Sequence, residues 1–526
     1  FHWNTPIVTG LSTKKSAAGK PLFNLYMANQ YLYKSTDEGR NWQRISPDLT
    51  TNDKAKQKTE ESGGITGDNT SAENHCTIYT ITQHASNENI IWVGTDDGNL
   101  QVTTDGGKTW TNKAPEVWKA GIPKAAWVSC IELSSLNPKR MYASFDNHMY
   151  GDHAAYFAVS NDAGNTWKRI ASPEFTGFAH VIREDIKNEK LLFAGTEMGL
   201  FISIDGGANW MRSKYQEMPW YNLVRDIKIH PKTGDLLVAS HGRGIYIIDD
   251  LQPLRELVKS DVNTEVILYP VNDFIYDYSP QLPATGDNID GYTAGNKVIL
   301  PAINYYLKQR SESAIKIEIY DAANKKIKDI NGTAVKGLNK VYWPFNINPP
   351  KVAKGGFVAG SSVLFSGFVA PRVPVGKYKV VLLAGGKKYE QFINIKPNDA
   401  KGFGAKNIDK LYQQAMRLYN VHEKLAVLVD TMDKTIATLT KIENKTPANQ
   451  VALASLDSMR KEILELNRKT IFFDEFKYRR RLSDLYLEVA TSLDPLSASK
   501  EGSIDLLEKE FIVFYNQFYG ILKKNG

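Results

Sequence analysis

Ser203-Ile204-Asp205-Gly206-Gly207-Ala208-Asn209-Trp210 is one of four copies of a single pattern, Ser/Thr-x-Asp-x-Gly-x-x-Trp, within the first 210 residues. The other copies are Ser35–Trp42, Thr103–Trp110 and Ser160–Trp167, in the last of which Asn161 fills the variable second position. Successive aspartates of the pattern lie 68, 57 and 43 residues apart. A core unit of about 40 residues predicts a repeat architecture, and that length suits a four-stranded propeller blade.

The eight residues of the pattern contain the hydrogen-bond acceptors, the glycine and the apolar cover that one turn needs. The carboxylate and the hydroxyl accept hydrogen bonds from backbone N–H groups, the glycine supplies a positive φ, and the tryptophan covers the turn. We therefore predict that the aspartates and tryptophans of all four copies are structural. These residues are Asp37, Trp42, Asp105, Trp110, Asp162, Trp167, Asp205 and Trp210.

A short apolar run that ends in small residues precedes each of the second, third and fourth copies of the pattern, and one more such run follows the fourth copy. They are Ile91–Thr95, Met141–Ser144, Leu191–Thr196 and Leu236–Ser240, and each is typical of a buried strand. The fifth unit reaches Ile245–Asp249 without a copy of the pattern, as expected of a last blade. The first unit is expected to lack its early strands.

The composition excludes several classes of protein. The chain has 526 residues, 42% of them apolar, and a net charge of +7 that is spread along the sequence. Because no long apolar run and no basic stripe is visible, we predict neither a membrane span nor nucleic-acid binding. The two cysteines, Cys76 and Cys130, fit buried free thiols, although a single bridge between neighbouring blades is the alternative.

The pattern of the chain changes after residue 250. Residues 251–290 are predicted to form an extended connector, with Pro253, Pro270 and Pro280. Residues 291–398 alternate at period 2, for example over Ile315–Tyr320 and Tyr378–Leu383, which predicts a small β-sandwich of the immunoglobulin or fibronectin type.

Residues 401–526 are predicted to form a helical bundle. Leu411, Leu418, Leu425 and Met432 belong to one stripe with spacings of three and four residues, and Leu507–Ile521 carries another. The predicted fold is thus mainly β: propeller blades over residues 1–250, then a β-sandwich and a C-terminal α-helical bundle of four helices.

Several segments together resemble the closing part of large bacterial Asp-box (BNR) proteins with sortilin/VPS10-like repeats, which are often labelled glycosyl hydrolases. The segments are Val181–Asp185, Gly195–Glu197, Ser203–Gly207, His241–Ile245, Asp249-Asp250 and Pro253–Arg255. The resemblance implies a secreted, periplasmic or outer-surface location in a bacterial cell envelope. It also implies further blades upstream of Phe1 in the same polypeptide. A self-contained ring of five blades is the competing interpretation.

In propellers of this kind the Asp boxes lie between the third and fourth strands, on the face opposite the usual site. The turns one hairpin earlier are therefore the expected functional positions. They supply the candidate catalytic residues Asp96, Asp97, Asp146 and Glu197. Together with the links between blades they also supply the candidate ligand-binding residues Trp127, Trp220, Tyr221, His241 and Arg243.

Carboxylates beside aromatic side chains suit the recognition of a sugar or of a protein surface. We predict a non-catalytic scaffold that binds protein or glycan. The alternative is a glycoside hydrolase that acts on polysaccharide through two carboxylates. The Phe/Tyr-Arg-Ile-Pro signature of sialidases is absent from the sequence. His148, Asp152 and His153 lack a helical frame for zinc, so no metal and no cofactor are expected.

Overall fold

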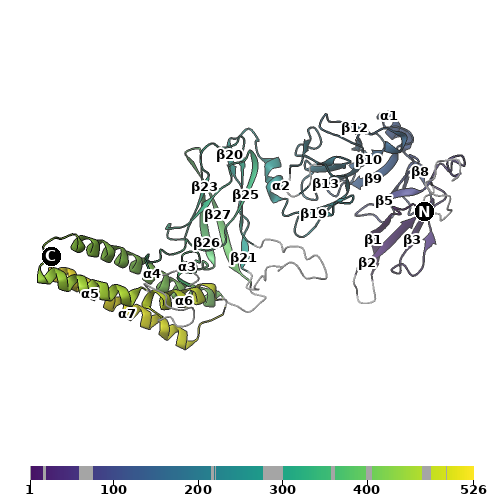
Figure 1. Cartoon of the computed structure of the whole chain (residues 1–526). Coiled ribbons are helices and arrows are strands. Elements are labelled where there is room, and N and C mark those ends of the chain that lie inside the picture. The colour runs from purple at the N-terminus through teal and green to yellow at the C-terminus, as the bar shows by residue number, and fades with distance from the viewer. Residues whose placement is uncertain are drawn as a thin grey trace. The chain divides into compact units, whose positions relative to one another are not determined.

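The structure is a computed structural model of the whole chain. It describes residues 2–15, 19, 21–58, 75–214, 218, 221–276, 300–356, 362–398, 405–464, 476–492 and 494–525. The chain divides into two compact units, Phe1–Asp261 (unit 1) and Val262–Gly526 (unit 2), shown in Figure 1. The finer domain boundaries expected from the sequence stay predictions.

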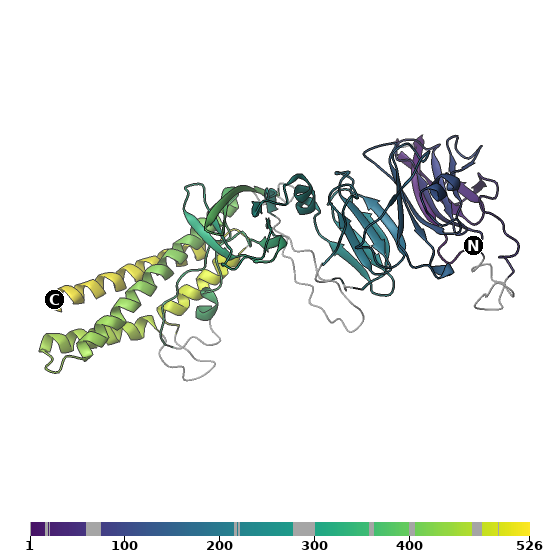
Figure 2. The same cartoon turned by 90° about the horizontal axis from the view of Figure 1, so that it is seen from above.

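Unit 1 consists of five small antiparallel sheets that follow one another along the chain (Figure 2). The first four have four strands each, in simple sequence order, and the fifth has three. Their strands are β1 (Ile7–Lys15), β2 (Pro21–Ala28), β3 (Leu32–Ser35) and β4 (Gln43–Arg44); β5 (Ile78–Gln83), β6 (Ile91–Thr95), β7 (Leu100–Thr103) and β8 (Thr111–Asn112); β9 (Trp127–Leu133), β10 (Met141–Asp146), β11 (Tyr156–Ser160) and β12 (Lys168–Ile170); β13 (Ala179–Glu184), β14 (Leu192–Thr196), β15 (Gly199–Ser203) and β16 (Met211–Arg212); and β17 (Val224–Ile229), β18 (Leu236–Ser240) and β19 (Ile245–Ile248). The short helix α1 (Ala114–Lys119) and the 3-10 turn η1 (His148–Tyr150) lie in the connections.

Consecutive sheets pack against one another, and glycines in two of their second strands make a close approach possible. The first strands β5, β9, β13 and β17 of successive sheets contact one another. A Cβ atom on Gly94 of β6 would lie 2.5 Å from the side chain of Val128 in β9. A Cβ atom on Gly195 of β14 would lie 2.6 Å from Val224 in β17. Glycine at these positions therefore lets the next sheet approach closely.

Each copy of the repeated eight-residue pattern forms the turn between the third and fourth strands of its sheet, as expected. In the fourth sheet the Ser203 hydroxyl donates to the Asp205 carboxylate at 2.8 Å and accepts the backbone N–H of Gly207 at 2.8 Å. Asp205 also accepts the backbone N–H of Asn209 at 2.9 Å. The same bonds recur in the other three turns. Hydrogen bonds from Thr166 lower the pKa of Asp162 to about 2, which fits a charged acceptor held by its own turn.

Two sequence-based expectations about unit 1 are wrong. The first sheet is complete, because β1 and β2 form an antiparallel pair with Ile7 opposite Met27 and Leu11 opposite Phe23. The predicted connector is not extended, because it contains helix α2 (Gln252–Lys259). Leu251 lies in the core of the fourth and fifth sheets, Leu254 packs against that core, and Arg255 pairs with Asp185, so contacts with these sheets stabilise the helix.

Unit 2 begins with two sheets that share one hydrophobic core. The first sheet has the order β20-β22-β25 and the second has the order β21-β27-β26-β23-β24. Ile303 and Tyr305 from the first sheet and Ile317, Val380 and Ile393 from the second belong to the same buried cluster. The strands are β20 (Val266–Leu268), β21 (Phe274–Tyr276), β22 (Ala302–Leu307), β23 (Lys316–Tyr320), β24 (Lys326–Asn331), β25 (Gly337–Tyr342), β26 (Gly376–Ala384) and β27 (Lys387–Pro397), and a short helix α3 (Ser362–Ser366) precedes β26.

The C-terminal region is helical, as predicted. Its four long helices are α4 (Ala405–Thr440), α5 (Pro447–Ile463), α6 (Tyr478–Thr491) and α7 (Ala498–Asn525). Leu418, Leu456, Leu482 and Phe518 each come from a different one of these helices and lie in one buried cluster. The helices contact the rest of unit 2, because Tyr412 and Met416 of α4 pack against the core of the two sheets and the Tyr486 hydroxyl donates to the carbonyl of Val369, in the loop before β26, at 2.9 Å.

Candidate ligand-binding face

One end of the sheets in unit 1 carries the same irregularity four times. The strands β5, β9, β13 and β17 each contain one extra residue that has no partner in the second strand of the same sheet. It is the second residue of the strand in β5, β13 and β17 and the third in β9, and such an extra residue is called a β-bulge. Aligning the registers shows that the bulged residues are Tyr79, Ser129, His180 and Arg225. A bulge re-aims a side chain, and bulges are frequent next to functional sites. We call the surface around these four residues the bulge face.

The bulge face carries a group of aromatic rings. The ring of Tyr79 lies 5.5 Å from that of Trp127 and 6.3 Å from that of His180, measured between centroids. Arg225 and Asn4 lie close enough to the Tyr79 hydroxyl to affect its pKa. Burial raises the pKa of the Tyr79 hydroxyl, which therefore stays protonated near neutral pH. The sequence-predicted Trp127 thus lies in a built cluster of aromatic and polar side chains.

Asp146 forms the centre of a histidine pair beside this cluster. Its Oδ1 lies 2.5 Å from Nδ1 of His148, and its Oδ2 lies 3.9 Å from Nδ1 of the buried His180. The ring of His148 stacks on Phe178 with 4.2 Å between centroids. Burial alone would raise the pKa of Asp146, but the neighbouring His180 and the hydrogen bonds from His148 outweigh it, so the pKa is lowered. Asp146 is therefore a charged acceptor that orients the imidazole of His148 and lies beside that of His180.

The candidate acids Asp96 and Asp97 are occupied by their own chain. Asp96 is 1% exposed and accepts the backbone N–H and the hydroxyl of Thr77, both at 2.8 Å. Asp97 is 6% exposed and accepts the backbone N–H and the hydroxyl of Thr51, both at 2.7 Å, as well as the Thr95 hydroxyl. Burial raises the pKa of Asp96 to about 7. Both carboxylates hold neighbouring loops in place through these hydrogen bonds, and neither has an oxygen atom that is open to a ligand.

Glu197 is the most accessible of the predicted acids. It follows β14 just as Asp96 follows β6 and Asp146 ends β10, so the three occupy equivalent places in their sheets. Its side chain is 27% exposed, and its Oε2 lies 3.4 Å from Nδ1 of His153. Glu197 and His153 therefore form a solvated rim beside the stacked ring of His148.

The remaining predicted residues lie at the fifth sheet. His241 follows β18 at the place equivalent to Glu197, and both His241 and Arg243 are exposed. Tyr221 is 66% exposed, and its ring lies 4.7 Å from the guanidinium carbon of Arg212. Trp220 lies outside the described residues. Tyr221 is the aromatic side chain of this part that is open to a partner.

Sequence analysis missed Tyr79, His180 and Arg225. Each is the second residue of an apolar strand, where an alternating pattern favours structural side chains. The sequence signal that could have identified them is the repeat itself. The bulge position of the first strand holds a polar or aromatic residue in four consecutive sheets. The bulge that turns them toward one face is a property of strand register and is not visible in composition.

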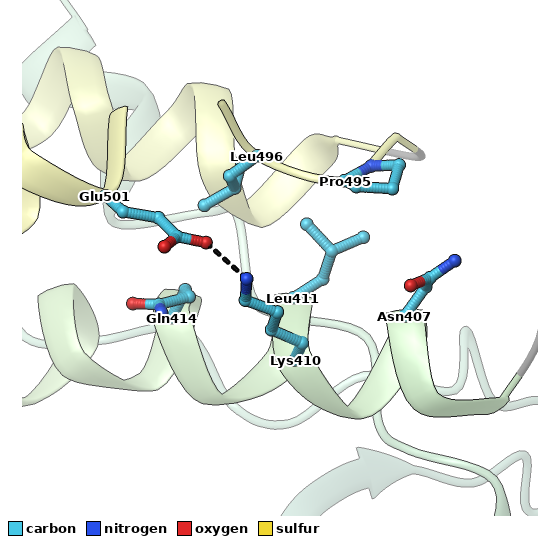
Figure 3. Close-up of a pocket in the computed structure, with 7 residues that line it drawn as sticks. All are labelled: Asn407, Lys410, Leu411, Gln414, Pro495, Leu496 and Glu501. Carbon is cyan, nitrogen blue, oxygen red and sulfur yellow. Dashed lines mark ion pairs between the residues drawn. The ribbon is translucent and has the colours of Figure 1, made fainter. Parts of the chain in front are cut away.

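No other part of the described chain offers a comparable site. Among the described residues no group of three or more His, Cys, Asp or Glu side chains could hold a metal ion. Cys76 and Cys130 are both free and buried. Figure 3 shows a shallow pocket between α4 and α7, where Lys410 Nζ pairs with Glu501 at 2.6 Å. This partly exposed ion pair links the two helices across the pocket.

Comparisons with known proteins give similarity of structure only. No protein-family model matches the chain, and no curated protein sequence matches it. A crystal structure of an ancestral GH74 enzyme is 14% identical, with a TM-score of 0.31, over 74% of this chain and 46% of that one. The GH74 xyloglucanase from Xanthomonas campestris is 17% identical, with a TM-score of 0.34, over 71% of this chain and 62% of its own. YCF48 from Cyanidioschyzon merolae is 13% identical, with a TM-score of 0.30, over 44% of this chain and 66% of its own.

The chain spans less than two thirds of the length of the two GH74 structures. At these identities and TM-scores the likeness indicates nothing about activity. Among the described helices, none combines the length and the apolar character needed to cross a membrane.

Proposed function

We propose that the chain is a non-catalytic scaffold that binds a protein or glycan ligand on the bulge face. The observation that carries the proposal is the contrast between two sets of side chains. Asp96 and Asp97 are consumed by hydrogen bonds within the chain. The half-buried side chains of Trp127 and Arg225 lie on the third and fifth sheets, around the buried ring of Tyr79 on the second sheet. The accessible parts of Trp127 and Arg225 provide contact area and hydrogen-bond donors, as a binding face requires.

In this proposal the sheets of unit 1 are blades of an Asp-box β-propeller from a secreted or cell-envelope protein. The outer faces of the first and last sheets support further blades from an upstream part of the same polypeptide. Ile7 and Phe23 on the first sheet and Ile245 and Ile247 on the fifth are 46–71% exposed. Covering these faces would remove apolar surface and an open strand edge from water. The intact mass of the native protein, compared with the 59.0 kDa of this chain, tests this part.

A glycoside hydrolase is the second candidate, and one observation favours it. The pKa of Asp96 near 7 matches the requirement for a general acid at neutral pH. The burial of Asp96 and its bonds to Thr77 oppose this role, because a glycosidic oxygen has no access to the carboxyl group.

Binding and hydrolysis assays separate the two candidates. Wild type and Trp127→Ala are applied to glycan and peptide arrays, with Trp42→Ala on an Asp-box turn as the matched control. We expect wild type and the control to bind and Trp127→Ala to lose binding. No reducing sugar should be released from polysaccharide. Release that disappears in Asp96→Asn or Glu197→Gln would establish the hydrolase instead.

A further inference from the structure

A group of polar side chains is buried where helix α6 packs against helix α4 in unit 2. His422 of α4 and Ser483 of α6 are both 0% exposed, and Arg479 of α6 is 1% exposed. The ring of His422 meets the buried ring of Tyr486 edge to face, with 5.2 Å between centroids. Because Arg479, Ser483 and Tyr486 are spaced by four and three residues, they share one face of α6. This helix contact therefore holds polar groups that are shielded from water.

The hydrogen bonds of this group are unevenly distributed. Tyr486 and Arg479 each donate to carbonyls of the connection between β25 and β26. Within the described part of the chain, neither ring nitrogen of His422 has a hydrogen-bond partner, and neither has the Ser483 hydroxyl. An imidazole that is buried without partners is tolerated in its neutral form, because an uncompensated charge in an apolar interior is costly.

The groups around His422 oppose a positive charge on its ring. Burial and, after it, the neighbouring Arg479 lower the pKa of His422 to about 3. Burial raises the pKa of Tyr486 on α6 and of Tyr419 on α4, so both hydroxyls are neutral near pH 7. The carboxylate of Glu423, the next residue of α4, accepts a backbone N–H of the loop after β25. Among the described residues, no carboxylate forms an ion pair with the imidazole.

The proton linkage of this contact has a definite sign. The ordinary pKa of a histidine is about 6.5, so at lower pH the imidazole takes up a proton when α6 moves away and loses it when the contact forms. The contribution of His422 to the contact is therefore fully present above about pH 7 and is lost as the pH falls toward about 3. From about pH 7.5 to about pH 5 the ratio of open to closed contact should rise about 30-fold.

We propose that the contact between α4 and α6 is an acid-sensitive conformational switch, in which protonation of His422 separates the two helices. The separation withdraws the Arg479 and Tyr486 donors from their carbonyls and opens the buried cluster of the helices to water. His422 is the single histidine of residues 262–526, so no second imidazole shares this role in unit 2. The bulge face belongs to unit 1, so failure of this inference leaves the proposed binding function untouched.

Hydrogen exchange of the full chain, followed by mass spectrometry, tests the switch because it reports each helix and strand separately. Exchange is measured between about pH 5 and about pH 7.5, and the chemical exchange rate at each pH is divided out. In wild type we expect the opening equilibrium of α6 amides to rise about 30-fold on acidification, whereas β23 and β26 stay protected. Equal protection of α6 at both ends of the range would overturn the proposal. An equal rise in β26 would do so as well, because unit 2 would then open as a whole.

Two substitutions assign the response to the imidazole. His422→Leu keeps the side-chain volume, and His422→Phe keeps a ring against Tyr486, but neither side chain binds a proton. We expect the acid response of α6 in either variant to be less than about threefold. His230→Gln replaces an exposed histidine of unit 1 and is the control, which should keep the wild-type response of α6. Thermal unfolding at neutral pH identifies the folded variants, and a wild-type acid response in a folded His422 variant would overturn the proposal.

Discussion

The guanidinium of Arg255 forms a two-pronged ion pair with the carboxylate of Asp185. Nε lies 2.9 Å from Oδ2 and Nη2 lies 2.6 Å from Oδ1, and the two side chains are only 5% and 0% exposed. The pair joins helix α2 to the fourth sheet across 70 residues of sequence. Together with the packing of Leu251 and Leu254 against the core of the sheets, it makes α2 part of unit 1.

Breaking this buried pair should destabilise unit 1 strongly. Arg255→Ala leaves the Asp185 carboxylate buried without its counter-ion, so we expect a loss of about 3–5 kcal/mol in the free energy of unfolding. Urea unfolding of wild type and variant measures the change. Lys259→Ala on the same helix is the matched control, because Lys259 is solvated in its pair with Glu256 and its loss should cost at most about 1 kcal/mol. Equal effects of the two substitutions would contradict the role assigned to Arg255.

A second prediction concerns the repeated eight-residue turn of the third sheet. Gly164 has φ +79°, and a Cβ atom there would lie 2.4 Å from the ring of Trp92 in the second sheet. Gly164→Ala should therefore combine backbone strain with a clash between two sheets, at a cost of about 3 kcal/mol. Chemical denaturation monitored by tryptophan fluorescence provides the measurement.

Gly206→Ala is the control for Gly164→Ala. Gly206 has φ +75°, but nothing lies within 4 Å of its added Cβ atom. Only the backbone strain remains, which costs about 1–2 kcal/mol. If both variants lost the same stability, the packing of Gly164 against Trp92 would contribute nothing.

The repeated turns and the second strands were predictable because their signals are local. The bonds among Ser203, Asp205 and Gly207 join residues within five positions of one another, so the pattern itself contains its partners. The early strands of the first sheet escaped prediction for a physical reason. β1 ends in Lys14-Lys15 and is largely exposed, so its alternation lacks the buried residues that mark a strand.

The candidate site was predictable in position but not in chemistry. The repeat placed Asp96, Asp146 and Glu197 at equivalent turns, and the structure has them there. Their roles depend on partners from distant segments, such as Thr51 for Asp97, which no local pattern reveals. Tyr79 and His180 depend on strand register, which bulges alter.

The stability of unit 1 should depend on the ionisation of Asp96. Burial raises the pKa of this carboxyl group from 3.8 to about 7, so the folded state binds the proton more tightly than the unfolded state does. The contribution of Asp96 to the free energy of unfolding is therefore fully present below about pH 4 and is lost as the pH rises through about 7. We expect Asp96 to account for a decrease of up to about 4 kcal/mol over this range.

Comparing wild type with Asp96→Asn isolates the contribution of this group. Asp97 and His75 lie beside Asp96 and are present in both proteins, so their effects cancel to a first approximation in the difference. Urea midpoints at intervals between pH 4 and 8 should show that the wild type loses more stability with rising pH than the variant does. Parallel pH profiles would show that Asp96 is ionised in the folded state throughout.

The last prediction concerns a buried arginine in unit 2. Arg479 in α6 is 1% exposed, and its Nη1 donates to the carbonyls of Ala353 at 2.8 Å and Gly355 at 2.6 Å. The loop that carries these carbonyls follows β25 and precedes α3, so this side chain joins α6 to a connection between strands of the sheet region. Arg479→Ala should leave buried carbonyls without donors and remove packing, at a cost of about 3 kcal/mol.

Arg481→Ala on the same helix is the control, because it removes a half-exposed ion pair with Glu510 and should cost at most about 1 kcal/mol. Thermal unfolding measures the loss of stability in both variants. Similar losses would mean that the Arg479 contacts do not hold the helices to the loop.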